Sequence, residues 1–500
     1  MGLFMEHFDV VVVGAGLSGI GAGYHLQTMC PDKSYVMLEG RNDIGGTWDL
    51  FRYPGVRSDS DMHTLGYQFK PWTEAKAIAD GPSILKYLRQ TMHEFGIDKH
   101  IRYGHMVKDA QWSSEMARWT IRASVNGSEE LSEFTCGYLF MCSGYYSYKA
   151  GHTPEFAGRD EFNGQIIHPQ KWPEDLNFAG KRVVVIGSGA TAMTLVPAMA
   201  KTAAHVTMLQ RSPTYVATRP DVDALANRLR KLLPEKAAYA VTRWKNTKYQ
   251  QLVYKRTRTQ PEKVKEVLLG KVREELGPNY DVDKHFTPSY NPWDQRLCLV
   301  PNSDLFEVIR AGKASVVTDT IRCFNATGVV LDSGEHIEAD IIVTATGLEL
   351  VTLGEMDFIV DGEPVDFSKT WTYKGFAYSG VPNMASVFGY INASWTLRSD
   401  LISVYVCRLL NHMTRTNTTT CVPTLRDSDA GMPERPWVDQ FSAGYMERVM
   451  HKFPRQGNCE PWINPQNYSR DKKMFRSAPV DDGVMQFSTL VGESSTNAAR

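Results

Sequence analysis

The sequence has no paired-cysteine motif. Its eight cysteines are dispersed over 500 residues, and no two of them stand in a C-x-x-C arrangement. This spacing argues against a disulfide framework, a dithiol redox centre and a zinc site. We therefore expect reduced thiols, a cytoplasmic protein and no bound metal.

An excess of charge of either sign is also absent. The chain carries 55 Lys+Arg against 56 Asp+Glu, which leaves a net charge of −1. Such a balance indicates neither a nucleic-acid partner nor binding to an anionic membrane surface. A hydrophobic content of 42% and a charged content of 22% are typical of a soluble globular enzyme. A length of 500 residues predicts two or three domains.

Long uninterrupted apolar runs are missing as well. Residues 10–31 and residues 183–200 contain no charged side chain, but glycine turns break both stretches. Each stretch is typical of a strand-to-helix junction, so neither predicts a membrane span. The N-terminus lacks a basic region ahead of an apolar segment, so we expect no signal peptide.

The sequence does contain a glycine-rich turn directly after an apolar, β-branched run at residues 8–13. Gly14 permits a tight turn, Gly16 lets the backbone approach a pyrophosphate, and Gly19 lets the following helix pack closely on the strand. A second predicted strand ends in Glu39, which can accept hydrogen bonds from ribose hydroxyls. This strand–turn–helix–strand unit predicts a dinucleotide site suited to FAD.

A second glycine-rich turn follows another apolar strand later in the chain. It contains Gly187, Gly189 and Thr191, with an alanine in the place of the third glycine. The next predicted strand is followed by Arg211 and Ser212, and no acid stands where the first unit has its carboxylate. An arginine in this place attracts the 2′-phosphate of NADPH, whereas an acid would repel it. The chain therefore contains one unit suited to FAD and one suited to NADPH.

Another stretch of the first unit contains residue types that suit a flavin site. Gly46, Thr47 and Trp48 follow the first acid, and Gly46 has a second glycine before it. Paired glycines let a backbone lie close to a flat ring system, and the indole of Trp48 can cover one face of such a ring. A surface turn with a buried tryptophan is the alternative.

A loop ahead of the second glycine turn contains Phe162, Gly164, His168 and Trp172. Its residues alone predict only a packed tryptophan and a hydrogen-bonded histidine. The spacing Phe-x-Gly-x-x-x-His-x-x-x-Trp-Pro, however, resembles the fingerprint of type I Baeyer–Villiger monooxygenases, which are flavoproteins that use NADPH and dioxygen. The pattern Gly-Gly-x-Trp followed by Tyr-Pro-Gly-x-x-x-Asp, which ends at Asp59, resembles a second motif of that family, one that lies on the flavin.

The resemblance runs over nearly the whole chain and is closest to the ethionamide-activating subgroup of the family. It implies an α/β fold with two dinucleotide-binding, Rossmann-like domains. We expect residues 1–146 to form the first part of the FAD-binding domain and residues 147–347 to form the NADP-binding domain. Residues 348–500 would then form the second part of the FAD-binding domain and a C-terminal segment. A helical insertion is expected at about residues 221–290 of the NADP domain, where mixed charges at helical spacing predict solvated helix faces.

The resemblance also implies roles for three residues. Arg296 matches an active-site arginine that lies over the flavin, Asp59 matches the acid beside it, and Trp395 belongs to a segment close to flavin and nicotinamide. On spacing alone, a structural ion pair between Arg296 and Asp294 is equally consistent. The family often has a lysine directly before the arginine, whereas this chain has Gln295. We therefore expect the NADPH preference to depend more on Arg211.

The implied function is that of an FAD- and NADPH-dependent Baeyer–Villiger monooxygenase. Such an enzyme inserts one oxygen atom of O2 next to a ketone carbonyl to give an ester or lactone, and it can also oxidise sulfides. The alternative is a flavin-containing N- or S-monooxygenase without ester formation. Relatives of that type, however, end the fingerprint with an aromatic residue other than tryptophan, whereas this chain has Trp172 there. The missing C-x-x-C pair disfavours a pyridine-nucleotide disulfide reductase. A redox-sensing flavoprotein without turnover is the remaining class, and the sequence leaves the natural substrate and the oligomeric state open.

Overall fold

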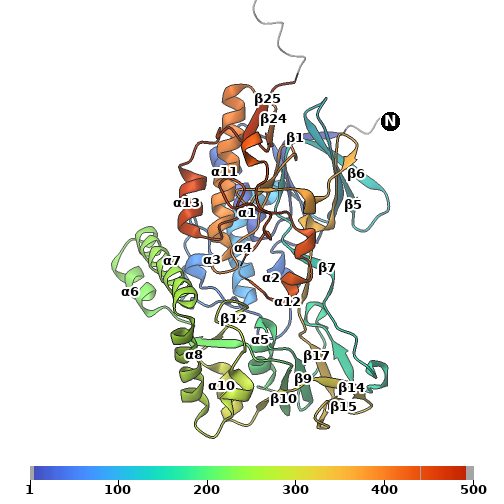
Figure 1. The fold of residues 1–500 in the computed structure, drawn as a ribbon, viewed down its shortest axis with the longest axis vertical. Coiled ribbons are helices and arrows are strands. Elements are labelled where there is room, and N and C mark those ends of the chain that lie inside the picture. The colour runs from blue at the N-terminus through green and yellow to red at the C-terminus, as the bar shows by residue number, and fades with distance from the viewer. Residues whose placement is uncertain (1–4, 440, 491–500) are drawn as a thin grey trace, which may run out of the picture.

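The structure is a computed structural model that describes residues 5–439 and 441–490. It contains two sheets with parallel cores, one in the upper half of the molecule and one in the lower half as drawn in Figure 1. This arrangement confirms the predicted α/β fold with two Rossmann-like domains. Residues 491–500 of the predicted C-terminal segment lie outside the described residues.

The first sheet has nine strands and contains the first dinucleotide unit. Strand β1, Glu6–Val13, pairs in parallel with β2, Tyr35–Leu38, and with β6, Leu131–Met141. Strand β6 also belongs to an antiparallel meander with β4, His105–Ser113, and β5, Arg118–Val125. The first sheet therefore combines a parallel part, which contains the dinucleotide unit, with an antiparallel part beside it.

The four valines at the end of β1 alternate between two hydrophobic cores. Val10 and Val12 pack with helices α1, Leu17–Met29, and α11, Trp395–Thr416, whereas the other two valines pack with the meander. None of the four side chains is more than 7% exposed. The strand is therefore buried on both faces, as its continuous apolar run predicts.

The second sheet consists of five parallel strands in the order β13-β10-β9-β17-β8. Helix α5, Ala190–Met199, directly follows the second glycine turn. The turn therefore lies at the carboxyl end of a parallel strand, where open α/β sheets bind their ligands. In chain order the strands are β8, Gln165–Ile167; β9, Arg182–Ile186; β10, His205–Gln210; β13, Ala314–Thr318; and β17, Ile341–Thr344.

Four helices interrupt this second unit between β11, Tyr215–Arg219, and β12, Leu297–Pro301. This confirms the predicted helical insertion, whose first two helices project at the left of Figure 1. No helix among the described residues has the length and apolar character that a membrane crossing requires. The four helices are α6, Ala224–Leu232; α7, Glu235–Thr259; α8, Pro261–Leu276; and α9, Val282–Phe286.

The chain passes between the two sheets at a short antiparallel ribbon. Strand β7, Tyr146–Gly151, leads out of the first sheet, and β18, Leu348–Leu350, leads back from the second. After the return, β23, Met384–Ser386, pairs with β6 and so joins the late part of the chain to the first sheet. The domain boundaries expected near residues 146 and 347 fall close to this ribbon and stay predictions.

Candidate active site

Both glycine turns border one cavity of about 1200 Å³. The first turn contributes Gly14 and Gly16 to its lining, and the second turn contributes Gly189 and Thr191. The carboxyl ends of two parallel sheets therefore face the same space, which is where α/β folds bind nucleotides and substrates. This cavity is the candidate active site.

The first turn admits only glycine at two of its positions. Gly14 has a φ of +99°, and a Cβ atom placed on it would lie 2.7 Å from the carbonyl oxygen of Cys142. A Cβ atom on Gly19 would lie 1.9 Å from the carbonyl oxygen of Gly14, which any side chain would displace. Gly16 lies against the backbone of Gly46, with 3.6 Å between its added Cβ and the Gly46 Cα. The backbone itself thus forms the surface on which a pyrophosphate would rest.

Glu39 is a buried acid at the carboxyl end of β2. Its side chain lines the cavity although the residue is only 2% exposed. One carboxylate oxygen accepts the backbone N–H of Ala15 at 2.7 Å, and the other accepts the backbone N–H of Arg41 at 2.9 Å. Burial raises the pKa of Glu39, and these two N–H donors oppose that shift. The carboxylate is therefore held in one orientation, with lone pairs left to accept ribose hydroxyls.

The second turn has a different environment. A Cβ atom on Gly187 would lie 2.3 Å from the carbonyl oxygen of Ala345, whereas one on Gly189 would meet no atom within 4 Å. The backbone at Gly189 therefore borders open space that a dinucleotide phosphate could occupy. Arg211 and Ser212 are exposed and lie outside the cavity lining. Ser212 is nevertheless next to the turn, because its carbonyl accepts the hydroxyl of Ser188 at 3.1 Å.

Arg296 and Asp59 meet in the cavity from opposite parts of the chain. The Arg296 Nη1 atom lies 3.5 Å from the Asp59 Oδ2 atom, and the two side chains are 32% and 45% exposed. At this distance and exposure the ion pair adds little to stability, so its consequence is the orientation of the guanidinium. The pKa of Arg296 is raised well above its ordinary value, first by Tyr445 and then by Asp59, against the lowering effect of burial. A permanent positive charge thus borders the cavity.

Asp294 does not pair with Arg296, so that alternative is excluded. Its carboxylate accepts a hydrogen bond from Arg258 of α7 at 2.6 Å and from the backbone N–H of Asn291 at 3.1 Å. Its carbonyl accepts the backbone N–H of Ser442 at 2.8 Å. Asp294 therefore anchors the loop that carries Arg296 to both the helical insertion and the C-terminal part of the chain.

An aromatic wall borders Arg296, and most of it was missed in the sequence. Trp395 donates its indole N–H to the hydroxyl of Ser18 at 2.8 Å and stacks on Tyr145 with ring centroids 5.1 Å apart. The hydroxyls of Tyr145 and Tyr146 lie 2.9 Å from each other. Burial raises the pKa of Tyr145 to about 12, so the phenol stays neutral. The position of these tyrosines shortly after the carboxyl end of β6 was a usable signal, whereas Tyr445 has none in its local sequence.

Trp395 is the first residue of helix α11 and directly follows Ser394. Thr47 and Trp48 are the first two residues of the short helix α2, Thr47–Leu50, and both belong to the cavity lining. The first turn of each helix therefore contributes an aromatic ring to this site.

The fingerprint loop binds the ribbon between the sheets and does not line the cavity. The His168 Nε2 atom lies 3.1 Å from the Gly347 carbonyl oxygen, and its Nδ1 atom accepts the backbone N–H of Gln170 at 3.2 Å. Gln170 in turn donates to the carbonyl of Ser147 at 2.7 Å. Burial lowers the pKa of His168, although the Gly347 carbonyl opposes this shift. The neutral imidazole, with its proton on Nε2, therefore joins the loop to both crossing strands.

The other fingerprint residues have packing roles in the structure. Phe162 is buried in a core of the second domain, and Trp172 packs at the edge of another beside Phe178. A Cβ atom on Gly164 would lie 2.4 Å from the Asp340 carbonyl oxygen, so the loop closes on the sheet only with glycine there. None of these three residues belongs to the cavity lining found in the described part of the chain.

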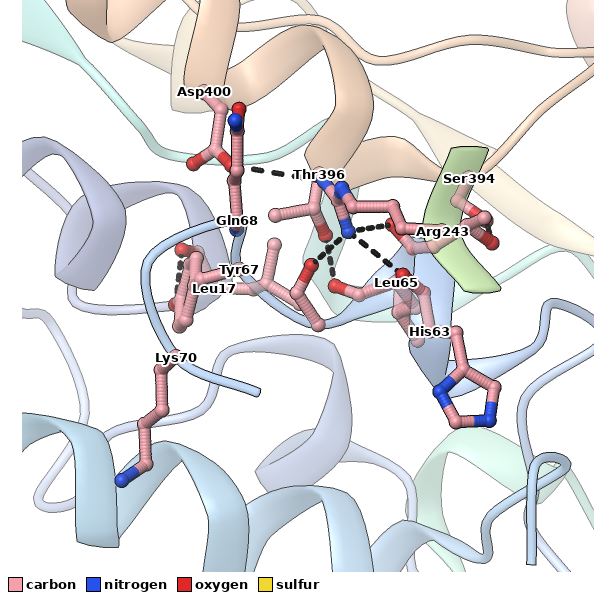
Figure 2. Close-up of polar contacts among 12 residues, drawn as sticks. Leu17, His63, Leu65, Tyr67, Gln68, Lys70, Arg243, Ser394, Thr396 and Asp400 are labelled. Atoms are coloured by element: carbon pink, nitrogen blue, oxygen red, sulfur yellow. Dashed lines mark hydrogen bonds and ion pairs between the residues drawn. The ribbon is translucent and has the colours of Figure 1, made fainter. Parts of the chain in front are cut away.

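The inner face of α7 is bound to the first domain by polar contacts. The Arg243 Nη1 atom lies 2.9, 3.1 and 2.7 Å from the carbonyl oxygens of His63, Thr64 and Gly66, at the end of helix α3, Met62–Leu65 (Figure 2). Its Nη2 atom lies 3.8 Å from a carboxylate oxygen of Asp400 in α11. Arg243 is only 8% exposed, so these contacts are shielded from water.

Two further side chains continue the inner face of α7. Asn246 and Gln250 donate to the two carboxylate oxygens of Asp61 at 2.9 and 3.0 Å. Gln250 also lines the cavity, and Asp61 is two residues from Asp59. The contacts of α7 with α3 therefore place one cavity wall and the acid of the Arg296 pair at the same time.

Comparison with known proteins agrees with this geometry. Residues 8–352 match the family described as FMO-like, flavin-binding monooxygenase-like. The chain belongs to this family. FAD-containing monooxygenase EthA of Mycobacterium tuberculosis is 53% identical over 483 residues, which cover 96% of this chain and 98% of EthA. Putative FAD-containing monooxygenase MymA of the same organism is 49% identical over 486 residues, with 96% and 98% of the two chains covered.

Solved structures show the same fold at lower identity. A steroid monooxygenase bound to NADP superposes with a TM-score of 0.76 at 22% identity, covering 97% of this chain and 100% of its own. Cyclohexanone monooxygenase from Rhodococcus sp. Phi1 bound to NADP+ gives a TM-score of 0.73 at 20% identity with the same coverage. The predicted resemblance and the predicted class, a flavin monooxygenase, are confirmed.

We predict that Arg243→Met destabilises the protein by about 3 kcal/mol, because it removes the buried donor of three carbonyls and the cation beside Asp400. Thermal unfolding of the flavin-loaded protein would show a lower midpoint. Arg243→Lys keeps the charge but not the planar guanidinium, so its unfolding midpoint should lie between those of the wild type and Arg243→Met. The exposed Arg228→Met is the control and should melt like the wild type. Equal midpoints for Arg243→Met and Arg228→Met would contradict this role.

A second prediction concerns the protonation state of His168. Its pKa is lowered by burial in the folded protein and is about 6.5 in the unfolded chain. The unfolded state therefore binds more protons near and below that pH, so stability from this residue is full above about pH 6.5 and is lost as the pH falls. His168→Gln keeps a donor but does not titrate. The unfolding midpoint of the wild type, measured relative to that of His168→Gln, should therefore fall as the pH is lowered from about 8 to about 5.5. A difference between the two midpoints that does not change with pH would assign the pH effect to another residue.

Proposed function

We propose that the chain is an FAD- and NADPH-dependent Baeyer–Villiger monooxygenase that acts on a small ketone. The overall reaction converts a ketone, O2, NADPH and a proton into an ester or lactone, NADP+ and water. The main support is the Arg296–Asp59 pair, which lies in the cavity that both glycine turns border. The relatives are named FAD-containing monooxygenases, and fold neighbours were solved with NADP, which supports the two cofactors. All eight cysteines are free, in keeping with the cytoplasmic location we propose.

The residues of the first unit fit FAD. Gly14, Gly16 and Gly19 leave a backbone surface for the pyrophosphate, and the oriented carboxylate of Glu39 accepts ribose hydroxyls. Trp48 and Trp395 supply aromatic surfaces at the cavity for a flat ring system. Bound FAD supplies the redox chemistry, which consists of accepting a hydride from NADPH and activating O2.

The residues of the second unit fit NADPH. The open backbone at Gly189 and the hydroxyl of Thr191 border the cavity and would receive the phosphates. Arg211 follows β10 and, together with Ser212, would bind the 2′-phosphate. His168 acts at a distance from the chemistry: it binds Gly347 and accepts from the backbone of Gln170, whose side chain binds Ser147, so the loop joins the two strands on which the relative placement of the units depends.

Arg296 has the charge that oxygen insertion requires. Attack on a ketone carbonyl develops negative charge on the carbonyl oxygen, and a fixed cation stabilises such charge strongly where water is scarce. Asp59 orients the guanidinium, and Asp294 holds the loop on which it stands. The neutral phenols of Tyr145 and Tyr146 border the same space and limit the entry of water.

A flavin N- or S-monooxygenase is the second candidate, because the cavity also has room for a sulfide. Oxidation of a sulfide forms no carbonyl oxyanion, so it does not require the positive charge of Arg296. Gas chromatography of products from linear, cyclic and aryl ketones and from aryl sulfides separates the two candidates. Ester or lactone formation supports the first, whereas sulfoxide formation with no ester from any ketone would support the second.

We predict that Arg296→Ala abolishes ester formation while NADPH is still oxidised, with hydrogen peroxide as the product. Loss of one oxyanion-stabilising group costs about 3–4 kcal/mol in comparable sites, a rate loss of about 100- to 1000-fold. Hydride transfer forms no such oxyanion and should suffer less. Product analysis and a peroxide assay measure the two outcomes, and Arg296→Lys should retain part of the ester yield. Near wild-type ester formation by Arg296→Ala would refute the assignment.

The coenzyme preference should depend on Arg211. We expect Arg211→Gln to raise the KM for NADPH by about 10- to 100-fold, since a charge-assisted contact of about 1.5–3 kcal/mol is lost. The KM for NADH should change little because NADH lacks the 2′-phosphate. Lys313→Gln is a matched control, because this exposed cation precedes the neighbouring parallel strand β13 and so lies at the amino ends of the strands, away from Arg211 at their carboxyl ends. Steady-state kinetics with both coenzymes test the prediction, and equal effects on the two would disprove it.

A further inference from the structure

Exposed apolar side chains gather on the helical insertion. Among the described residues fourteen large hydrophobic side chains are exposed, and nine of them lie between residues 222 and 267. This stretch is less than a tenth of the chain, so the clustering is far from even. The nine residues are Val222, Leu225, Leu232, Leu233, Val241, Trp244, Tyr249, Leu252 and Val267.

The outer face of α7 presents a regular part of this cluster. Val241, Trp244, Lys248, Leu252 and Lys255 follow one another at intervals of three or four residues, which places them on one side of a helix. Val241, Trp244 and Leu252 are 45%, 65% and 47% exposed. The opposite side of α7 is bound to α3 through Arg243, so the helix cannot turn this face inward.

Helices α6 and α7 carry a local excess of positive charge. Residues 224–261 contain ten Lys and Arg but only one acid, Glu235. Within the part of the chain that the structure describes, six of these basic residues are exposed and form no ion pair: Arg228, Lys231, Lys236, Lys248, Lys255 and Arg256. Helix α8 contains four acids and four basic residues, so it does not offset this excess, which the near-neutral charge of the whole chain conceals.

We propose that α6 and the outer face of α7 dock on the surface of an anionic lipid bilayer. Exposed tryptophan, leucine and valine side chains beside lysine and arginine match an interface with acyl chains below anionic headgroups. A second copy of this chain fits poorly, since a symmetric contact would bring the basic faces together. Nucleic acid would use the cations but gains nothing from three exposed aliphatic and aromatic side chains on one helix face.

The docking face lies beside an entrance to the active-site cavity. Tyr249 and Val267 are each 60% exposed and also belong to the cavity lining, together with Arg256 of α7. A bilayer against α7 would therefore lie next to this side of the cavity. Apolar substrates dissolved in the bilayer could then enter without crossing water. Binding to lipid does not depend on the reaction proposed above, so the two can fail separately.

Co-sedimentation of the full-length, flavin-loaded protein with lipid vesicles tests the docking face. We expect binding to vesicles of phosphatidylcholine mixed with phosphatidylglycerol, weaker binding to phosphatidylcholine alone, and weakening by salt. Lys248→Glu/Lys255→Glu should reduce the bound fraction at limiting lipid at least about tenfold, since each cation near an anionic surface contributes to binding. Lys201→Glu/Lys313→Glu changes the net charge equally at exposed sites of the second domain and should bind like the wild type.

The apolar part of the face has its own matched pair. Trp244→Ser should also lower vesicle binding, whereas Leu425→Ser, at an exposed apolar site elsewhere, should not. Absence of wild-type binding to the anionic vesicles would overturn the proposal, as would equal losses in the two charge-reversal variants. Binding of a DNA duplex as tightly as of the vesicles would overturn it in favour of a nucleic acid. Self-association in sedimentation velocity that Trp244→Ser abolishes would overturn it in favour of a second copy.

Discussion

The contact of Arg243 with the last carbonyls of α3 is the interaction on which the geometry of the cavity depends. One guanidinium satisfies three backbone acceptors of the first domain and lies beside Asp400, while its own helix belongs to the insertion in the second domain. Because the site is buried, leaving either partner unpaired would be costly, so α7 has one stable placement. That placement puts Gln250 in the cavity wall, fixes Asp61 close to Asp59, and leaves the opposite face of α7 to the solvent.

The reactive part of the cavity is assembled from segments that are far apart in the chain. Arg296 and Asp59 form only a loose ion pair, so their relative position must be imposed by the segments that carry them. Asp294 ties the Arg296 loop to α7 and to Ser442, and α7 in turn holds the Asp59 loop. The charge of the site is thus positioned by supporting hydrogen bonds and not by the pair itself, an arrangement that suits stabilisation of charge developing in a reaction.

Much of the fold and part of the candidate site could be predicted because they depend on local sequence. A continuous apolar run followed by Gly14, Gly16 and Gly19 can hardly form anything other than a buried strand and a tight turn, since a Cβ atom at Gly14 or Gly19 would collide with the backbone. The buried, hydrogen-bonded place of Glu39 follows from its position at the end of the next strand. The expected neighbourhood of Arg296 and Asp59, by contrast, came from family resemblance, because no local rule brings residues so far apart together.

The sequence by itself therefore determined the two dinucleotide units and the helical insertion, since strand runs, glycine turns and helical spacing act over a few residues. The class of enzyme was predicted from the family resemblance of its motifs. Tertiary structure alone decided that Asp294 binds Arg258 and not Arg296, and that Tyr145 stacks on Trp395. It also decided which face of α7 is buried, because both faces contain basic residues and only the position of α3 distinguishes them. Composition could not show the basic, apolar outer face for the same reason: a sum over the chain contains no information about where charges lie in space.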